Sequence, residues 1–106
     1  MAHTYKNSKV DLTATSVTTV YTVPTAATSI VKSILVSDDS GSGDTITLTI
    51  TNGSDVFSLF KTKTITANGT SELLTAPLVL TAGEILKATA ATADRLHIVC
   101  SYLEIT

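Results

Sequence analysis

The sequence predicts an all-β protein: a single-domain, two-sheet β-sandwich of jelly-roll or immunoglobulin-like topology, with about eight short antiparallel strands. Three observations predict this class. Threonine, valine and isoleucine dominate the segments between turns, and β-branched side chains favour strands. Turn signals recur at the spacing that is typical of a sandwich or barrel. A length of 106 residues, 43% of them hydrophobic, provides for one core and one domain.

The chain begins with a polar segment, residues 1–8, which we expect to be a flexible N-terminal arm. Such an arm either stays loose or becomes ordered on a neighbouring molecule. The sandwich domain is then expected over residues 9–106, with a marginal first strand at 9–13. A strand at 17–23 follows and ends at Pro24, because proline lacks a donor for the strand ladder.

The next expected strand, residues 29–37, carries apolar side chains on both faces. Regular alternation places Ile30, Ile34 and Val36 on one face. Val31 and Leu35 then lie on the other face. A strand of this kind is covered on each side, which suggests a contact with another subunit.

The strongest strand signal lies at residues 45–51, where isoleucine and leucine alternate strictly with threonine. Asn52-Gly53 then provides a tight turn, and a second apolar run starts at residue 56, so the pair predicts a β-hairpin. The second run continues to residue 65. Another Asn-Gly pair at 68–69 and a strand-like run at 71–74 extend the prediction to a meander.

The last third of the sequence predicts three more strands, at residues 78–80, 84–90 and 95–105. Alanines in the middle segment would also suit a helix, but the turn signals on both sides favour a hairpin arm. The final strand is again two-sided. Its members on one face are Leu96, Ile98, Cys100 and Tyr102, and those on the other are Val99, Leu103 and Ile105.

Composition and charge exclude several classes of function. A net charge of −2 and scattered basic residues disfavour nucleic-acid binding, and the Lys61 and Lys63 pair is interpreted as a solvated face. The single Cys100 forms no internal disulfide. No apolar run is long enough for a membrane-spanning helix or a signal peptide, so we expect no membrane partner and synthesis in a cytoplasm.

No set of residues predicts catalysis, a metal site or a cofactor site. His97 and Cys100 are three residues apart on a strand, so they should face opposite ways, and His3 lies in the expected arm. The acidic loop with Asp38, Asp39 and Asp44 is the best candidate for a bound ion, but its spacing does not match an EF-hand. We interpret it as a flexible loop and expect no enzyme activity.

A glycan-binding module is a further alternative, and it would need an exposed aromatic platform. The chain has no tryptophan and few aromatic residues to share between a core and a platform. The aromatic residues are Tyr5, Tyr21, Tyr102, Phe57 and Phe60.

Four motifs lie in the first third and the last third of the chain. Residues 20–24 read Val-Tyr-Thr-Val-Pro, and residues 30–34 read Ile-Val-Lys-Ser-Ile. Residues 80–88 read Leu-Thr-Ala-Gly-Glu-Ile-Leu-Lys-Ala, and residues 98–105 read Ile-Val-Cys-Ser-Tyr-Leu-Glu-Ile. Together these motifs resemble those of small all-β virion structural proteins of tailed bacteriophages. The resemblance spans nearly the whole chain beyond the first dozen residues.

The resemblance implies a virion structural protein made in the host bacterial cytoplasm, and it carries over no active-site residue. Capsid decoration is the first expectation: a cement protein that binds the major capsid protein and stabilises the head. A neck, tail or fibre accessory protein is the alternative. We also expect a homo-oligomer, with a trimer as the first guess, and subunit contacts on the two-sided strands 29–37 and 95–105.

Overall fold

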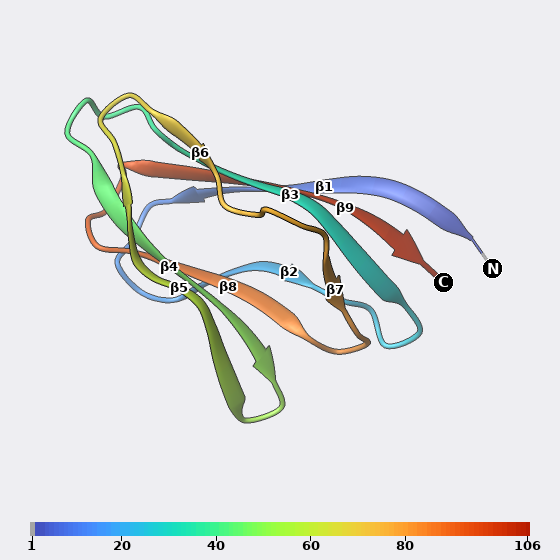
Figure 1. Cartoon of the computed structure of the whole chain (residues 1–106). Helices are drawn as coiled ribbons and strands as arrows, with labels where there is room; N and C mark the ends of the chain where they lie inside the picture. The colour runs from blue at the N-terminus through green and yellow to red at the C-terminus, as the bar shows by residue number, and fades with distance from the viewer. Residues whose placement is uncertain (1) are drawn as a thin grey trace.

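A computed structural model describes residues 2–106 as two antiparallel β-sheets packed face to face (Figure 1). This arrangement confirms the predicted all-β sandwich. The nine strands are β1 (His3–Leu12), β2 (Thr18–Thr22), β3 (Thr28–Asp38), β4 (Asp44–Asn52), β5 (Asp55–Ile65), β6 (Thr70–Glu72), β7 (Leu78–Leu80), β8 (Ile85–Ala90) and β9 (Leu96–Ile105).

The pairing of the strands gives a jelly-roll topology. The first sheet has the order β1-β9-β3-β6, with β7 also beside β3, and the second has the order β2-β8-β4-β5. The early strands therefore pair with the late strands in reverse order, as in one long hairpin rolled into two layers. Because β6 and β7 share one edge position along β3, the nine strands fill eight positions.

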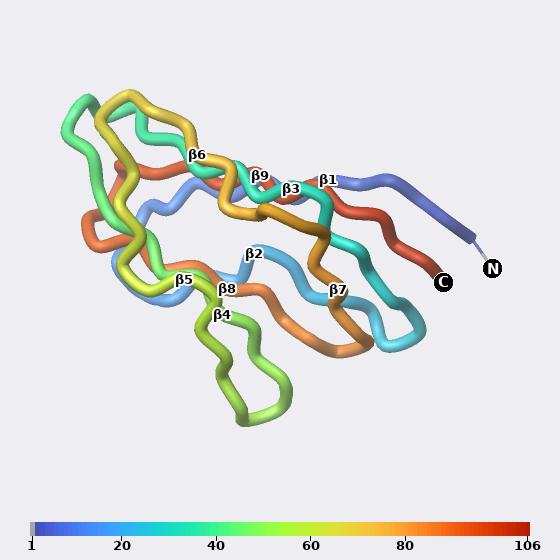
Figure 2. Tube along the Cα trace, in the orientation of Figure 1, coloured from blue at the N-terminus to red at the C-terminus, as the bar shows by residue number. Residues whose placement is uncertain are grey.

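The predicted hairpin at residues 45–60 is confirmed as β4 and β5, and it projects away from the body of the molecule (Figure 2). Its two-residue turn is Gly53-Ser54, where Gly53 adopts a positive φ of 61° that suits a hairpin turn. The predicted meander is wrong, because the chain crosses to the first sheet after the turn at Asn68, and β6 pairs with β3.

The structure also corrects the boundary at the N-terminus. Residues 3–8, which we expected in a flexible arm, form the first half of β1, while Met1 lies outside the described residues. The ladder to β9 runs unbroken from His3 opposite Ile105 to Leu12 opposite Leu96. Sequence alternation could not reveal this strand half because both of its faces are largely exposed.

Strand β3 contains a bulge that the sequence does not reveal. Its register with β9 shifts between Val31 and Ser33, so Lys32 is an extra residue. Before the bulge Val31 faces the core, and after it Ile34 and Val36 do. The prediction that Ile30 shares a face with Ile34 is therefore wrong.

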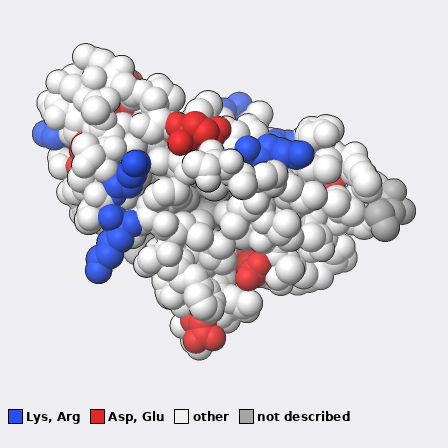
Figure 3. Space-filling model, in the orientation of Figure 1, with Lys and Arg blue, Asp and Glu red and all other residues white. Residues whose placement is uncertain are grey.

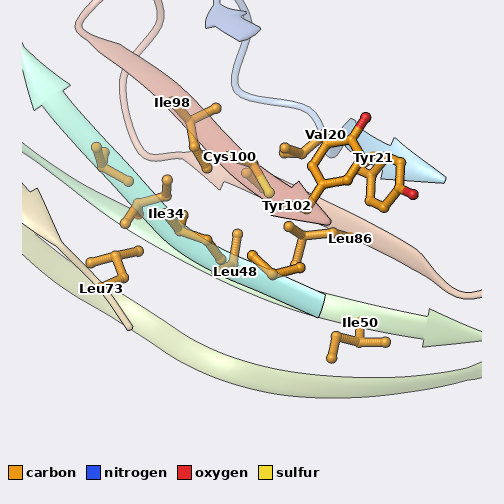
Figure 4. Close-up of a cluster of buried hydrophobic side chains, with 14 of the residues drawn as sticks. Val20, Tyr21, Ile34, Leu48, Ile50, Leu73, Leu86, Ile98, Cys100 and Tyr102 are labelled. Atoms are coloured by element: carbon orange, nitrogen blue, oxygen red, sulfur yellow. The ribbon is translucent and has the colours of Figure 1, made fainter. Parts of the chain in front are cut away.

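The core lies between the two sheets and is built from the inward members of each alternating strand (Figure 4). On β9 the predicted inward set of Leu96, Ile98, Cys100 and Tyr102 is buried. On β4 the inward residues are Ile46, Leu48 and Ile50, which confirms the predicted alternation. Each large side chain in this layer contributes about 1.5–3 kcal/mol through burial.

Candidate assembly surface

A polar cluster between the two sheets, near the C-terminal end of β9, joins them. Glu104 is buried, and its two carboxylate oxygens accept hydrogen bonds from Lys6 Nζ at 2.9 Å and from Tyr21 Oη at 2.8 Å. Tyr21 Oη also lies 2.6 Å from Ser29 Oγ, and its ring stacks on Tyr102 with 4.0 Å between centroids. Because Tyr21 belongs to β2 and Glu104 to β9, the cluster bridges the second sheet and the first.

Charge and burial together shift the ionisation of this cluster. The hydrogen bond from Lys6, followed by that from Tyr21, lowers the pKa of Glu104, and the same Glu104 contact raises the pKa of Lys6. Burial is the main reason that the pKa values of Tyr21 and Tyr102 are raised. The cluster therefore holds an ionised pair and two neutral tyrosines at neutral pH.

The cluster joins the first and the last of the motifs that carry the resemblance. Tyr21 comes from the Val-Tyr-Thr-Val-Pro segment, and Tyr102 and Glu104 come from the last motif, eighty residues further along the chain. Likewise, the backbone of Val23 exchanges hydrogen bonds with Gly83 and Glu84 of the third motif. Tyr21, Val23, Gly83, Tyr102 and Glu104 are therefore framework residues, which stabilise the fold.

The outer face of the first sheet carries apolar side chains in straight rows. In one row Tyr5 lies opposite Leu103, Leu103 opposite Ile30, and Ile30 opposite Val79, so the row crosses β1, β9, β3 and β7. Four strands span about 14 Å. A parallel row contains Lys9, Val99 and Leu35.

We call these outward side chains the apolar face: Tyr5, Ile30, Leu35, Val79, Val99, Leu103 and Ile105. Tyr5 is 76% exposed, Val79 57% and Leu35 39%, and the others are partly exposed. Exposed apolar residues scattered singly are ordinary, but contiguous rows mark interaction sites in soluble proteins. The subunit contacts expected on strands 29–37 and 95–105 would therefore lie on this apolar face.

The outer face of the second sheet has a different chemistry. Its outward residues on β2, β4 and β8 are mostly threonines, with Thr47 opposite Thr89 and Thr49 opposite Lys87. We call this the threonine face: Thr19, Thr45, Thr47, Thr49, Thr51 and Thr89. Among the outward residues near the hairpin, Ile85 and Val56 are the apolar exceptions.

A second exposed apolar site lies at the projecting hairpin. Val56 is 62% exposed and Phe57 is 56% exposed, both close to the turn. Near the base of the hairpin, a groove is lined by Leu59, Phe60, Leu73, Leu74, Thr75, Ala76, Pro77 and Leu78. This site belongs to one hairpin and one loop, whereas the apolar face extends over four strands.

The residues considered for nucleophilic chemistry are separated as predicted. Cys100 is buried in the core, and burial raises its pKa to about 12. His97 lies on the outer face, with Nε2 3.2 Å from Asp11 and Nδ1 3.7 Å from Asp39. His3 lies at the far end of β1, opposite Ile105.

The three acidic residues of the loop have separate protein partners. Asp38 accepts hydrogen bonds from Ser40 and from the Gly43 amide, and the Ser40 hydroxyl is the main cause of its lowered pKa. Asp44 accepts from the Thr92 amide, and Asp39 lies near His97. In residues 2–106 no three histidine, cysteine or acidic side chains gather as a metal ion would require.

In residues 2–106, the basic and aromatic residues lie on several different strands. Lys61 and Lys63 are exposed, and Thr62 between them has a φ of 50°. On the side shown in Figure 3, basic side chains lie close together at the left, whereas the acidic groups are well separated. Tyr21 and Tyr102 are buried, which leaves Tyr5 and Phe57 on strands at distant edges.

Sequence reasoning missed Tyr5, Val79 and the buried cluster. Tyr5 lies in the segment expected to be a flexible arm, and Val79 lies in a strand of only three residues. One signal was present for the cluster: Glu104 continues the inward alternation of Ile98, Cys100 and Tyr102, so it was due to be buried. Its partners, Lys6 and Tyr21, are distant in sequence and could not be found this way.

No protein-family model matches the chain, and no curated protein sequence matches it. Solved structures that match the chain include the following three. A chain from the Bacillus endospore appendages, described as disulfide-linked pili, has a TM-score of 0.58 at 11% identity, covering 98% of this chain and 88% of that one. A pentameric capsid protein from metagenomic phage sequences has 0.45 at 20% identity, covering 92% and 59%. The Eiger TNF of S. frugiperda has 0.42 at 18% identity, covering 83% and 64%.

At 11% identity, the similarity to the appendage chain concerns the fold alone. Within residues 2–106 no helix could cross a membrane. The chain is a jelly-roll β-sandwich with one apolar and one hydroxyl-rich outer face.

Proposed function

We propose that this protein is a virion structural protein of a tailed bacteriophage, a capsid decoration protein that binds the major capsid protein and stabilises the head. The observation that carries the proposal is the apolar face. Its longest row crosses four strands with Tyr5 and Val79 more than half exposed, which a protein that works alone has no reason to keep.

The resemblance of the four motifs to those of phage virion proteins is the reason for proposing a phage protein as the partner. The fold supports the same role, because jelly rolls are common among capsid domains. The similarity to a chain of the Bacillus endospore appendages adds an example of this fold within an assembled fibre. The proposed mode of action is non-enzymatic: a rigid sandwich covers the junctions between capsid subunits and buries apolar surface there.

A neck, tail or fibre accessory protein is the second candidate, because the same apolar face would serve any virion partner. A glycan-binding module is less favoured. The stacked pair of Tyr21 and Tyr102 is committed to the core, where Tyr21 also binds Glu104.

The decisive experiment mixes the purified chain with heads of the phage that encodes it, prepared without the chain, and sediments the heads. Tails from the same phage are tested in parallel. We expect saturable binding to heads, and heads that resist heating better when coated. Binding to tails alone would transfer the function to the second candidate, and binding to neither would contradict a virion role.

A further inference from the structure

We propose that two copies of this chain join through the open edge of β1, antiparallel and about a two-fold axis, to form one continuous sheet. In residues 2–106, β1 pairs with β9 on one side and with no strand on the other. A long strand with an open edge is a template for another strand. This edge is ten residues long, free of proline and free of bulges.

The backbone groups available on this edge follow from the ladder to β9. Ala2 and Thr106 exchange both of their hydrogen bonds, with N···O distances of 3.2 and 2.9 Å. Because antiparallel bonds alternate along a strand, the even-numbered residues of β1 bond to β9. The odd-numbered residues therefore direct their N–H and C=O groups to the open edge: His3, Tyr5, Asn7, Lys9 and Asp11.

Symmetry restricts the registers that a second copy can adopt. An antiparallel pair of identical strands needs a two-fold axis normal to the sheet, and this axis keeps the two outer faces on the same side. Side chains that lie opposite each other then point to the same face, so odd residues must oppose odd residues. The axis must consequently pass through a residue of β1.

Charge selects among these registers. An axis at Lys6 or Lys9 would place two lysines directly opposite each other, which is unfavourable. An axis at Asn7 places Tyr5 opposite Lys9 of the second copy and His3 opposite Asp11 of the second copy. It also gives nearly full overlap of the two strands, with about ten ladder hydrogen bonds. An axis at Ser8 shortens the overlap and places Asp11 opposite Tyr5.

The register at Asn7 also joins the two apolar faces. The row of Val79, Ile30, Leu103 and Tyr5 would continue into Lys9, Val99 and Leu35 of the second copy. The symmetry of this joint makes a dimer, in place of the trimer expected from the sequence. The pair forms without any capsid, so its failure would leave the proposed function intact.

Single cysteines at the edge test the register. Asn7→Cys should form a disulfide-linked dimer on mild oxidation, because the two copies of residue 7 meet on the axis. Lys9→Cys is the matched control, since its two copies lie about 14 Å apart in this register. The unaltered chain should not cross-link because Cys100 is buried. Cross-linking through Ser8→Cys or Lys9→Cys instead of Asn7→Cys would overturn the register.

The mass of the protein in solution tests the joint itself. The unaltered chain should be a dimer by sedimentation equilibrium. Asn7→Pro should be a folded monomer with unchanged circular dichroism, since the Asn7 amide points to the open edge and proline is tolerated there. Asn7→Gln should remain a dimer. A monomeric or trimeric parent chain, or a dimer that Asn7→Pro leaves intact, would overturn the proposal.

Discussion

The apolar face and the threonine face are outer surfaces of two sheets that share one core, yet they differ in almost every outward residue. On β9 the outward residues are mainly apolar, whereas on β4 they are all threonines. Both strands bury their alternate residues equally well. Threonine suits a strand and keeps a hydroxyl in water, so the threonine face shows what the fold alone requires. The apolar face exceeds that requirement, which points to a partner.

The two sheets also differ at their edges. The outermost strand of the first sheet, β1, is held to β9 by the Lys6–Glu104 ion pair in addition to the ladder. In the second sheet, β4 and β5 are held by a tight hairpin instead. The ion pair lies beneath the apolar face and helps to hold β1 on β9. The stability of this strand pairing should therefore depend on pH.

The largest expected effect is a difference in binding to phage heads between a variant of the apolar face and a variant of the threonine face. Leu103→Lys places a charge in the middle of the apolar row and should weaken binding to phage heads at least tenfold, because burying an unpaired charge is costly. Thr49→Lys on the threonine face is the matched control and should bind like the unaltered chain. Sedimentation with heads measures both, and equal loss in the two variants would remove the distinction between the faces.

The next effect concerns the bulge at Lys32, which determines which side chains of β3 point outward. Glu72 accepts hydrogen bonds from Ser33, from the Ile34 amide at 2.7 Å and from the Leu74 amide at 3.3 Å. Burial opposes its ionisation, but these bonds outweigh burial and lower its pKa. Glu72→Ala should cost about 1–2 kcal/mol of unfolding free energy in urea, and Glu72→Gln should cost less. No loss in the alanine variant would show that the bulge holds without Glu72.

Acid should weaken the first sheet through Glu104. Its pKa in the folded protein lies below the ordinary value of 4.5, so its contribution is complete above that value and is lost as the pH falls below it. We expect this loss to be moderate, because Lys6 is half exposed and solvent screens the pair. Hydrogen exchange should show β1 opening before β4 in acid. In Glu104→Gln the acid-dependent part should shrink, and an unchanged acid profile would contradict this role.

The smallest effect is expected on the threonine face. Thr89→Val keeps a β-branched side chain on a partly exposed surface and should change the unfolding free energy by less than about 0.5 kcal/mol. Thr47 is unsuitable for this comparison because its hydroxyl accepts a hydrogen bond from the Thr62 amide. A loss above 1 kcal/mol would mean that the threonine hydroxyls contribute to the fold.

The sequence predicted what depends on local alternation. Strands β4 and β9 alternate strictly, and the Gly53 turn marks the hairpin, so these elements and their core residues were found. The sequence did not predict the features that depend on tertiary structure. The extra residue Lys32 reverses the pattern of β3, and only pairing with β9 reveals it.

The candidate surface was predicted in part for the same reason. Two-sided alternation indicated Leu103 on β9 and Leu35 on the part of β3 that follows the bulge. Tyr5 joins them only because the ladder to β9 orders the first half of β1. Lys6, Tyr21 and Glu104 are far apart in the sequence, so no local pattern could bring them together.

The most direct test of the role of the apolar face is a cryo-electron microscopy map of the assembled particle at side-chain resolution. We expect Tyr5, Leu103 and Ile30 to pack against a neighbouring virion protein, while the threonine face looks toward solvent. A map in which the threonine face or the hairpin tip at Phe57 makes the contact, with Leu103 in open solvent, would contradict that role.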